Sequence, residues 1–495
     1  MSFHQLDSGL FIPSGAYEAV SARERFEDDF DNYGPQSASE SGINTLHSYS
    51  KHYERNNPWA QNGINSWCAA AVGDGITPRW QLDDEGMSSE LQELWDDFAE
   101  ECDFNDKLNV CGLQSLGLKT TISSGTAYIV KRLRPLSEGH AVPLQIQILE
   151  PEQRNHETED GFLSNGDYIR SGVRYSEEGK RKAYCFHKYH PHDHIDADNE
   201  HCWINASDVS AMHRVDRPGQ ESGTPWLSSA LLRLRELDQY EDAELVRKKT
   251  AALFVMAVEE ESPVSEGRQP RGSGKQKETK DKLKKVLSPG TVQKLPAGMS
   301  ATFSNPADVG ATYEPWLRFQ LLSIAKGMGI TYEMLTGDLK NVNYSSIRAG
   351  LIEFRRLCEQ VQHNIVIRQF CRPVMAWFLD TVAMYKIIDL PEYTSNRRRY
   401  LNQIHWQLPR WDEVDPLKKV TSDVMEVRAG FSTIPDKLSE RGIDLNTFIR
   451  TTRMVNQLLD ENNILLDSDP RKVDGKGAYQ STLEDIDENE KNNFG

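Results

Sequence analysis

The residues best able to do chemistry lie in one histidine-rich stretch between His187 and His201. Imidazole nitrogens and neighbouring thiolates are good ligands for zinc. The spacing nevertheless fails the His-x-His-x-Asp-His pattern of metallohydrolases, because Asp193 alone separates His192 from His194. We therefore expect no bound metal and interpret the stretch as a polar loop that closes a hairpin. A metal-dependent nucleic-acid hydrolase that uses this His187–His201 cluster is the alternative function.

A second apparent motif, Gly272-Ser-Gly-Lys275, looks like the end of a phosphate-binding loop. Such a loop needs glycine five residues before the Gly-Lys pair and Ser or Thr directly after the lysine. Here those positions hold Gln269 and Gln276, so the motif is not met. The sequence also offers no Gly-x-Ser-x-Gly elbow and no clustered carboxylates of a nuclease. We predict a protein that is not an enzyme and that uses no cofactor.

The charge of the chain limits its partners. Its 495 residues include 57 Lys and Arg against 75 Asp and Glu, which gives a net charge of −18. Proteins that grip DNA firmly are usually basic, so this chain would touch DNA only through local cations. Charge alone favours a simpler explanation, in which acidity keeps a soluble protein dispersed.

Two further properties concern the environment of the chain. No apolar run reaches the roughly 18 residues of a membrane span, and the N-terminus does not follow the pattern of a signal peptide. The seven cysteines are scattered without paired spacing. We therefore expect free thiols in a reducing cytoplasm and no membrane partner.

The elements that must position any site are mainly helical. Apolar residues recur at helical spacing from Tyr53 to Ala71, and the glycines and proline of 73–78 should end that helix. Other helices are expected over 88–102, 106–122, 313–328 and 345–384, the last kinked by Pro373, followed by three short helices after Asp415-Pro416. Aromatic residues at helical spacing are expected in the core: Trp59, Trp67, Trp95 and Phe98.

Strand patterns and one long helix complete the expected elements. Strands are predicted over 126–133, 144–149 and 406–411, and a hairpin over 172–186 that turns at Glu178-Gly179. A helix of about 45 Å should run from Pro225 to Met256, with Thr224 as its N-cap and Pro225 at its first position. The basic segment 268–285 that follows reads as a loop.

Several motifs occur in an order and spacing that resemble the lambda family of bacteriophage portal proteins. The resemblance covers roughly residues 50–460 and rests on these segments: Arg55-Asn-Asn-Pro-Trp-Ala60, Gly73-Asp-Gly-Ile-Thr-Pro78, His190-Pro-His192, Arg217-Pro-Gly-Gln-Glu-Ser-Gly-Thr-Pro-Trp-Leu227, Leu335-Thr-Gly-Asp338, Asn343-Tyr-Ser-Ser346 and the region from Trp406 to Pro416.

The resemblance implies an α+β, mainly helical portal fold with long stem helices, assembled as a ring of about twelve copies. The implied parts are a flexible N-terminal arm (1–50), an α+β wing (51–223), a first stem helix (224–256), a clip with a basic loop (257–312), a second stem helix (313–330), a tunnel loop (331–344), a long kinked helix with the return to the wing (345–413), crown helices (414–462) and an acidic flexible tail (463–495).

The resemblance also implies which residues meet the partners. Lys340, Asn341 and Asn343 of the tunnel loop are the expected contacts to DNA, with a solvated turn as the simpler interpretation. Stem cations form a second candidate set, and clip cations are candidates for docking to the packaging motor: Arg247, Lys248 and Lys249 in the stem, and Arg268, Arg271, Lys275 and Lys277 in the clip.

Taken as a portal, the chain is expected at one vertex of the virion capsid after assembly in the host cytoplasm. There it would nucleate capsid assembly, let the terminase package double-stranded DNA, and let that DNA exit on infection. The implied partners are further copies of itself, the terminase large subunit, the major capsid protein and scaffold, and the head-completion or neck proteins. A scaffold or adaptor without a channel is a third hypothesis, distinguished by the lack of a closed ring.

Overall fold

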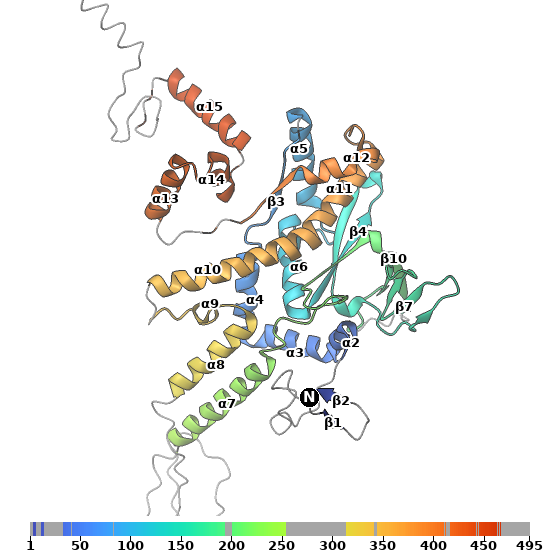
Figure 1. The fold of residues 1–495 in the computed structure, drawn as a ribbon, viewed down its shortest axis with the longest axis vertical. Helices are drawn as coiled ribbons and strands as arrows, with labels where there is room; N and C mark the ends of the chain where they lie inside the picture. Colours follow the sequence, from blue (N-terminus) through green and yellow to red (C-terminus); the bar gives the residue numbers. More distant parts are fainter. Residues whose placement is uncertain are drawn as a thin grey trace, which may run out of the picture. The chain divides into compact units, whose positions relative to one another are not determined.

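Helices predominate in the part of the chain that the computed structural model describes (Figure 1). That part comprises residues 3–5, 11–13, 33–40, 42–82, 84–193, 200–253, 313–340, 344–409, 411, 416–441, 443, 445–462, 464 and 466. The expected clip (257–312) and nearly all of the expected tail (463–495) lie outside these residues. None of the described helices is both long enough and apolar enough to cross a membrane.

Several of the described helices, such as those that start at Glu85, Tyr313 and Tyr344, begin within three residues of their predicted starts. The α-helices are α2 (Pro35–Glu40), α3 (Ile43–Asn56), α4 (Pro58–Ala71), α5 (Glu85–Glu101), α6 (Val110–Ser124), α7 (Leu231–Leu253), α8 (Tyr313–Met328), α9 (Tyr332–Thr336), α10 (Tyr344–Val361), α11 (Arg372–Tyr385), α12 (Tyr393–Asn402), α13 (Pro416–Arg428), α14 (Ile434–Glu440) and α15 (Leu445–Glu461). A π-helical stretch, Gln362–Cys371, joins α10 to α11.

The strands of the described residues form four small sheets. They are β1 (Phe3–Gln5), β2 (Phe11–Pro13), β3 (Thr77–Trp80), β4 (Thr126–Leu133), β5 (Leu144–Leu149), β6 (Gly161–Phe162), β7 (Tyr168–Arg170), β8 (Val173–Tyr175), β9 (Arg181–His187), β10 (His201–Asn205), β11 (Val209–His213) and β12 (Ile404–Gln407). The orders are β1-β2, β10-β9-β8-β7-β6, β11-β4-β5 and β12-β3. β4 and β5 have the predicted bounds, and β8 and β9 form the predicted hairpin.

The chain divides into two units, each built from separate stretches of sequence. The first unit contains residues 1–64, 119–128 and 149–337, and the second contains residues 65–118, 129–148 and 338–495. The five-stranded sheet and the helices α7 and α8 belong to the first unit. The pairing of β3 with β12 and the helices α10 to α15 belong to the second.

The helix expected from Tyr53 to Ala71 is interrupted at Asn57. Asn57 adopts an extended conformation, and its side-chain oxygen accepts a hydrogen bond from the Ala60 amide (3.0 Å). It therefore caps α4, with Pro58 in the first helical position, where a missing N–H costs nothing. The preceding helix α3 begins at Ile43, inside the segment 1–50 that the sequence indicated to be an arm.

The long helix after the Arg217–Leu227 motif starts later than predicted. Thr224 and Pro225 were expected to open it, but α7 begins at Leu231. The residues between them form turns, in which the Ala230 amide donates to the Leu227 carbonyl (2.8 Å). Trp226 is buried there, and its amide donates to the Ile122 carbonyl (2.9 Å). Tertiary packing of Trp226 therefore overrides the local helix-start signal.

A stretch of π-helix lies just before Pro373. The ten residues before α11 are π-helical, and the Arg372 amide donates to the carbonyl of Ile367, five residues back. Proline has no N–H, and in an α-helix its ring collides with the carbonyl four residues earlier. The wider π-helical turn provides room for the ring, so the rod continues from α10 to α11 without a break in helical structure (Figure 1).

Most of the aromatic residues expected in the core are buried. Trp95 and Phe98 of α5 meet Phe378 of α11, with ring centroids 5.1 and 5.3 Å from that of Phe378. Trp67 is buried against Phe354, whereas Trp59 is half-buried. All seven cysteines are free, as the scattered spacing predicted.

A close approach of two backbones shapes the first unit. Gly125 has a φ of +81°, and a Cβ on either Gly125 or Gly223 would overlap the carbonyl oxygen of the other. The Gly223 amide donates to the Thr126 hydroxyl (2.9 Å) at the same point. Glycine is therefore required at both positions, which explains Gly223 of the Arg217–Leu227 motif.

Beside this crossing, the first unit buries a polar cluster around Arg154, which is 1% exposed. A guanidinium nitrogen of Arg154 lies 3.0 Å from Nδ1 of His156. Burial, and then the nearby Arg154 charge, lower the pKa of His156 to about 3. Burial likewise lowers the pKa values of His47 and His213. These imidazoles are neutral in the folded protein at neutral pH.

The glycine crossing gives a first prediction. Gly223→Ala should destabilise the first unit by about 1–3 kcal/mol, because the methyl group must displace the Gly125 backbone. Urea unfolding of the purified protein measures the loss. Gly161→Ala is the matched control, since no atom lies within 4 Å of a Cβ at Gly161. Equal unfolding midpoints for the two variants would contradict the requirement for glycine at position 223.

The neutral histidines give a second prediction. Below its ordinary pKa of 6.5, His156 takes up a proton when unfolded but not when folded, so stability falls as pH falls from 6.5 toward 3. Between pH 6.5 and 5 this histidine should account for about 2 kcal/mol. His156→Gln should reduce the pH dependence of the free energy of unfolding in urea by that amount. The pH dependence that remains should come in part from His47 and His213. His52→Gln, at an exposed position, is the control, and an unchanged pH dependence in His156→Gln would overturn the assignment.

Candidate functional site

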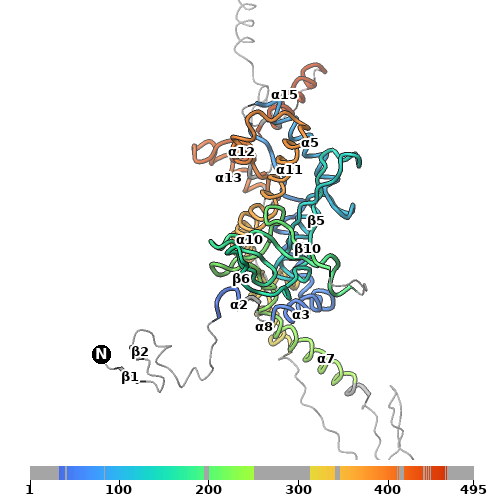
Figure 2. Tube along the Cα trace, turned by 90° about the vertical axis from the view of Figure 1, so that its right-hand side faces the viewer, coloured from blue at the N-terminus to red at the C-terminus, as the bar shows by residue number. Residues whose placement is uncertain are grey.

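The helices α7 and α8 lie side by side in both views of the first unit (Figures 1 and 2). Tyr240 of α7 packs on Trp316 of α8 with ring centroids 4.2 Å apart, and on Tyr313 at 6.1 Å. At the other end of the pair, the Ser229 hydroxyl donates to the Gly327 carbonyl (3.1 Å). Glycine at position 327 permits this close contact, because a Cβ there would lie 3.2 Å from the Ser229 hydroxyl.

The three candidate cations of α7 do not share one environment. Arg247 donates two hydrogen bonds, of 2.8 and 2.6 Å, to the carboxylate of buried Glu244. These bonds hold the pKa of Glu244 below its usual value. Lys248 lies 3.7 Å from the same carboxylate and 5.3 Å from the ring centre of Tyr313. Arg247 thus neutralises a buried acid, while Lys248 and Lys249 are exposed to solvent.

The segment that follows α8 is a capped turn. Thr331 caps α9, accepting a hydrogen bond from the Met334 amide (3.3 Å), and Gly337 ends the helix with a φ of +69°. Leu335 is 1% exposed and anchors the turn. This geometry accounts for the Leu-Thr-Gly-Asp motif, because only glycine adopts a left-handed C-cap without strain.

Lys340 lies beyond this cap and is exposed. Its backbone amide donates to the Asp338 side chain (3.1 Å), so the turn leaves the ammonium group in solvent. Asn341 and Asn343 lie outside the described residues, as do all four clip candidates, Arg268, Arg271, Lys275 and Lys277. Their expected roles stay predictions.

Two asparagines position these helices: Asn57 of the Arg55–Ala60 motif, and Asn62 of the helix α4 that follows it. The Asn57 side chain donates to Asp238 of α7 (2.8 Å). The Asn62 side chain donates to the carbonyls of Met334 and Leu335 at the end of α9 (2.9 and 2.8 Å). Sequence reasoning missed both roles, although the two consecutive asparagines before Pro58 were a visible capping signal.

The structure separates the histidines that the sequence groups together. His187 and His201 face each other as paired residues on β9 and β10. His190 instead lies 3.1 Å from the Glu150 carboxylate, and it forms with Glu150 and Glu152 a group whose ligand atoms are within 4.8 Å of one another. His194 lies outside the described residues.

An ammonium group already lies between these carboxylates. Lys51 Nζ is 2.5 Å from Glu150 and 2.9 Å from Glu152, and His47 is 3.5 Å from Glu152. Burial would raise the pKa of Glu152, but His47 and Lys51 outweigh it and hold the pKa below its usual value. The ammonium group of Lys51 thus already contacts both of the carboxylates that a metal would need. The cluster therefore joins α3 to the turn after β5 through ion pairs, and its geometry gives no support to the hydrolase.

Comparison with known proteins identifies the family. The profile described as "Phage portal protein, lambda family" matches residues 28–362. This range includes the Arg55–Ala60 and Arg217–Leu227 motifs, α7, α8 and the turn before α10. The chain is 25% identical over 415 residues to a probable portal protein of Halomonas phage phiHAP-1, covering 82% of this chain and 75% of that relative. It is 21% identical to the portal protein of Escherichia phage N15 and to portal protein B of Escherichia phage lambda, in each case covering 79% of both chains.

Among solved structures, the chain is similar to one from the neck of a native gene transfer agent particle computed with C12 symmetry. The identity is 14%, the TM-score is 0.41, and the match covers 86% of this chain and 99% of that one. A second is the neck of an empty particle computed with C6 symmetry, with 15% identity, a TM-score of 0.40, and coverage of 81% and 93%.

The family profile covers well over half of the sequence, and the motifs inside it have the helix-capping and packing roles described above. This chain therefore belongs to the lambda family of phage portal proteins, a family without enzymatic activity.

Proposed function

We propose that copies of this chain, about twelve, form the ring-shaped channel at one vertex of a phage capsid. Double-stranded DNA enters through it during packaging by the terminase and leaves through it on infection. The ring also nucleates capsid assembly, contacting the major capsid protein and scaffold, and later binds the head-completion proteins. Membership of the portal family supports the ring and the place in the virion.

The observation that best supports a channel is the packed pair of long helices α7 and α8, followed along the chain by the turn that Gly337 caps. We assign α7 and α8 to the stem, residues 331–344 to the tunnel loop, and 51–223 together with 345–413 to the wing. Residues 257–312 are the clip and 414–462 the crown. A packed antiparallel helix pair is a stiff strut, and a turn held at Leu335, Gly337 and Asp338 can present one cation reproducibly.

Exposed apolar side chains on the same helices support association between copies. Leu232 and Val246 of α7 are 72% and 61% exposed, and Phe319 of α8 is 61% exposed. Large apolar side chains gathered on one pair of helices mark a surface that a partner covers. In the proposed ring that partner is the neighbouring copy.

Imaging and native mass measurement of the purified chain test the ring. Rings of about twelve copies, with a central hole about as wide as duplex DNA, are expected. Phe319→Asp should reduce the ring fraction, because it places a charge in the contact between copies. Leu136→Asp, at a position of equal exposure on a surface turn, should not. A monomer or dimer that persists at every protein concentration would rule out the channel.

Lys340 is the described residue on which the DNA contact depends. In assembled rings, Lys340→Gln should weaken binding of short duplex DNA and lower the salt dependence of log K by about 1 per lost phosphate contact. Lys180→Gln, which removes a lysine 82% exposed in the β8–β9 hairpin, is the charge-matched control. Indistinguishable affinities for the two variants would show that the turn at Lys340 is only a solvated helix connection.

A further inference from the structure

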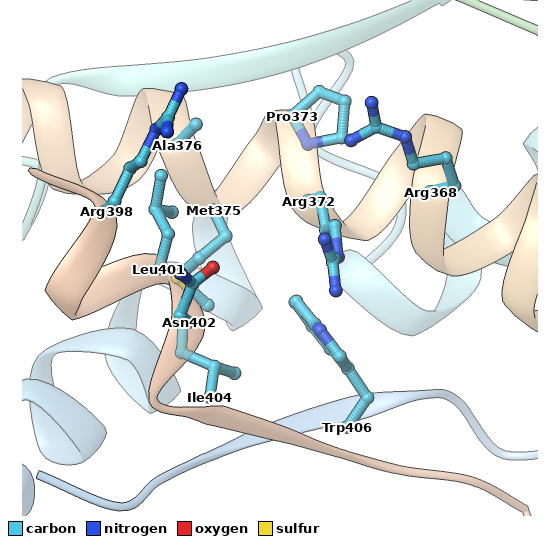
Figure 3. A pocket seen from close by; sticks show the side chains of 10 residues that line it. All are labelled: Arg368, Arg372, Pro373, Met375, Ala376, Arg398, Leu401, Asn402, Ile404 and Trp406. Carbon is cyan, nitrogen blue, oxygen red and sulfur yellow. The ribbon is translucent and has the colours of Figure 1, made fainter.

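Three arginines surround a hollow in the second unit (Figure 3). The hollow has a volume of about 440 Å³, within the range of roughly 300–1,000 Å³ typical of ligand pockets. The π-helical stretch, α11, α12 and β12 contribute its lining, which comprises Arg368, Arg372, Pro373, Met375, Ala376, Arg398, Leu401, Asn402, Ile404 and Trp406.

The charge of this lining is opposite to that of the chain. No Asp or Glu lines the hollow, whereas the sequence carries 75 acidic against 57 basic residues. Within the described residues, Arg368, Arg372 and Arg398 are exposed, and no carboxylate lies within ion-pair distance of any of them. Neighbouring Arg397 differs, since it donates two hydrogen bonds of 2.7 and 2.6 Å to Asp380. Arg397 thus pairs with Asp380, whereas the next residue, Arg398, faces the hollow.

The three guanidinium groups are spread along the helix and do not meet at one point. Figure 3 shows the Arg368 group beside Pro373 and the Arg398 group beside Ala376, with Arg372 between them and turned toward Trp406. Arg368 and Arg372 are one helical turn apart, and Ala376 is one turn further. A single small anion cannot contact all three groups, so the arrangement suits an extended ligand with several negative charges.

The floor of the hollow is apolar. Met375 and Ile404 are buried, and Leu401 and Trp406 are half-buried beside them. A nucleic-acid backbone offers phosphates to the arginines but no apolar group for such a floor. A peptide that combines carboxylates with apolar side chains fits both parts, because guanidinium groups bind carboxylates in a bidentate manner and the floor accepts the apolar groups.

We propose that this hollow binds an acidic, apolar-bearing peptide, and that its occupant is the chain's own segment Leu483–Glu490. That segment reads Leu-Glu-Asp-Ile-Asp-Glu-Asn-Glu, with two apolar residues three apart among five carboxylates. Leu483 follows the last described residue, Leu466, by 17 positions, and 17 residues span up to about 56 Å when extended. The segment would cover three arginines that are exposed in the described structure.

Peptide binding to the full-length chain tests the proposal. The probe is a labelled peptide of residues 481–492, followed by fluorescence anisotropy. The protein carries Glu484→Gln, Asp485→Asn, Asp487→Asn and Glu488→Gln, so that its own segment does not compete. Combined Arg368→Gln, Arg372→Gln and Arg398→Gln should weaken binding about tenfold. Arg→Lys at the same positions should restore only part of it, because lysine keeps the charge but not the bidentate geometry. Equal thermal unfolding midpoints show that the variants fold.

Two controls separate the hollow from general charge. Arg134→Gln, Lys180→Gln and Lys188→Gln together remove three cations from surface ion pairs elsewhere, and should leave peptide binding unchanged. A peptide with Leu483→Ser and Ile486→Ser should bind about tenfold more weakly, because the apolar floor loses its ligand. Equal loss in the control protein, or no loss with the serine peptide, would overturn the proposal.

Competition by other ligands identifies the occupant. A short DNA duplex that binds in an arginine-dependent way, while the peptide does not, would make the hollow a nucleic-acid site and overturn the peptide assignment. Displacement of the peptide by inorganic phosphate at constant ionic strength would indicate a single-anion site and would also overturn it. A peptide of residues 24–33, acidic and aromatic, that bound more tightly would assign the hollow to the N-terminal segment instead. Each outcome is independent of whether rings form.

Discussion

The close contact between Gly125 and Gly223 decides how the first unit is built. Two backbones without side chains lie against each other there, so the segment before α7 meets the start of β4 directly. From this point the chain reaches Trp226, whose amide bonds to the end of α6, and then the turns that start α7. The position of α7 in turn sets that of α8 through the Tyr240–Trp316 contact. The absence of a Cβ at Gly125 and at Gly223 thus helps to determine where the proposed stem begins.

Sequence reasoning succeeded where local pattern and tertiary packing agree. The strands β4 and β5 and the helix α8 have the bounds that the sequence pattern indicated. Consecutive residues of β4 and β5 are buried, whereas α8 buries one face. Sequence reasoning failed where contacts with a segment far away in the sequence determine the local structure. The start of α7 moved because Trp226 packs against another segment, and β3 was missed because Pro78 discouraged a strand whose partner, β12, lies more than 300 residues away. The π-helical stretch has no sequence signal other than the proline that it accommodates.

The candidate site was predictable only in part. Order and spacing of the motifs identified the family, which composition alone could not do, since the net charge of −18 fits many soluble proteins. The exposure of Lys340 agrees with the expected loop. The sequence places Glu244 and Arg247 three positions apart on one helix face, which allows an ion pair, but it does not show that Glu244 is buried. The contact of Lys51 with Glu150 and Glu152 joins residues about 100 positions apart, so no local reading of the histidines could reveal that an ammonium group already contacts both carboxylates.

The pairing of β3 with β12 also fixes the order of events during synthesis. Trp80 is buried in a sheet whose other strand begins at Ile404, 324 residues later. At roughly 5–20 residues per second, a ribosome needs about 15 to 65 s to make that interval. Throughout that time the second unit lacks a strand, although its first helices already exist. A nascent chain therefore cannot complete the second unit before β12 has been made, and copies can associate through a finished second unit only after that point.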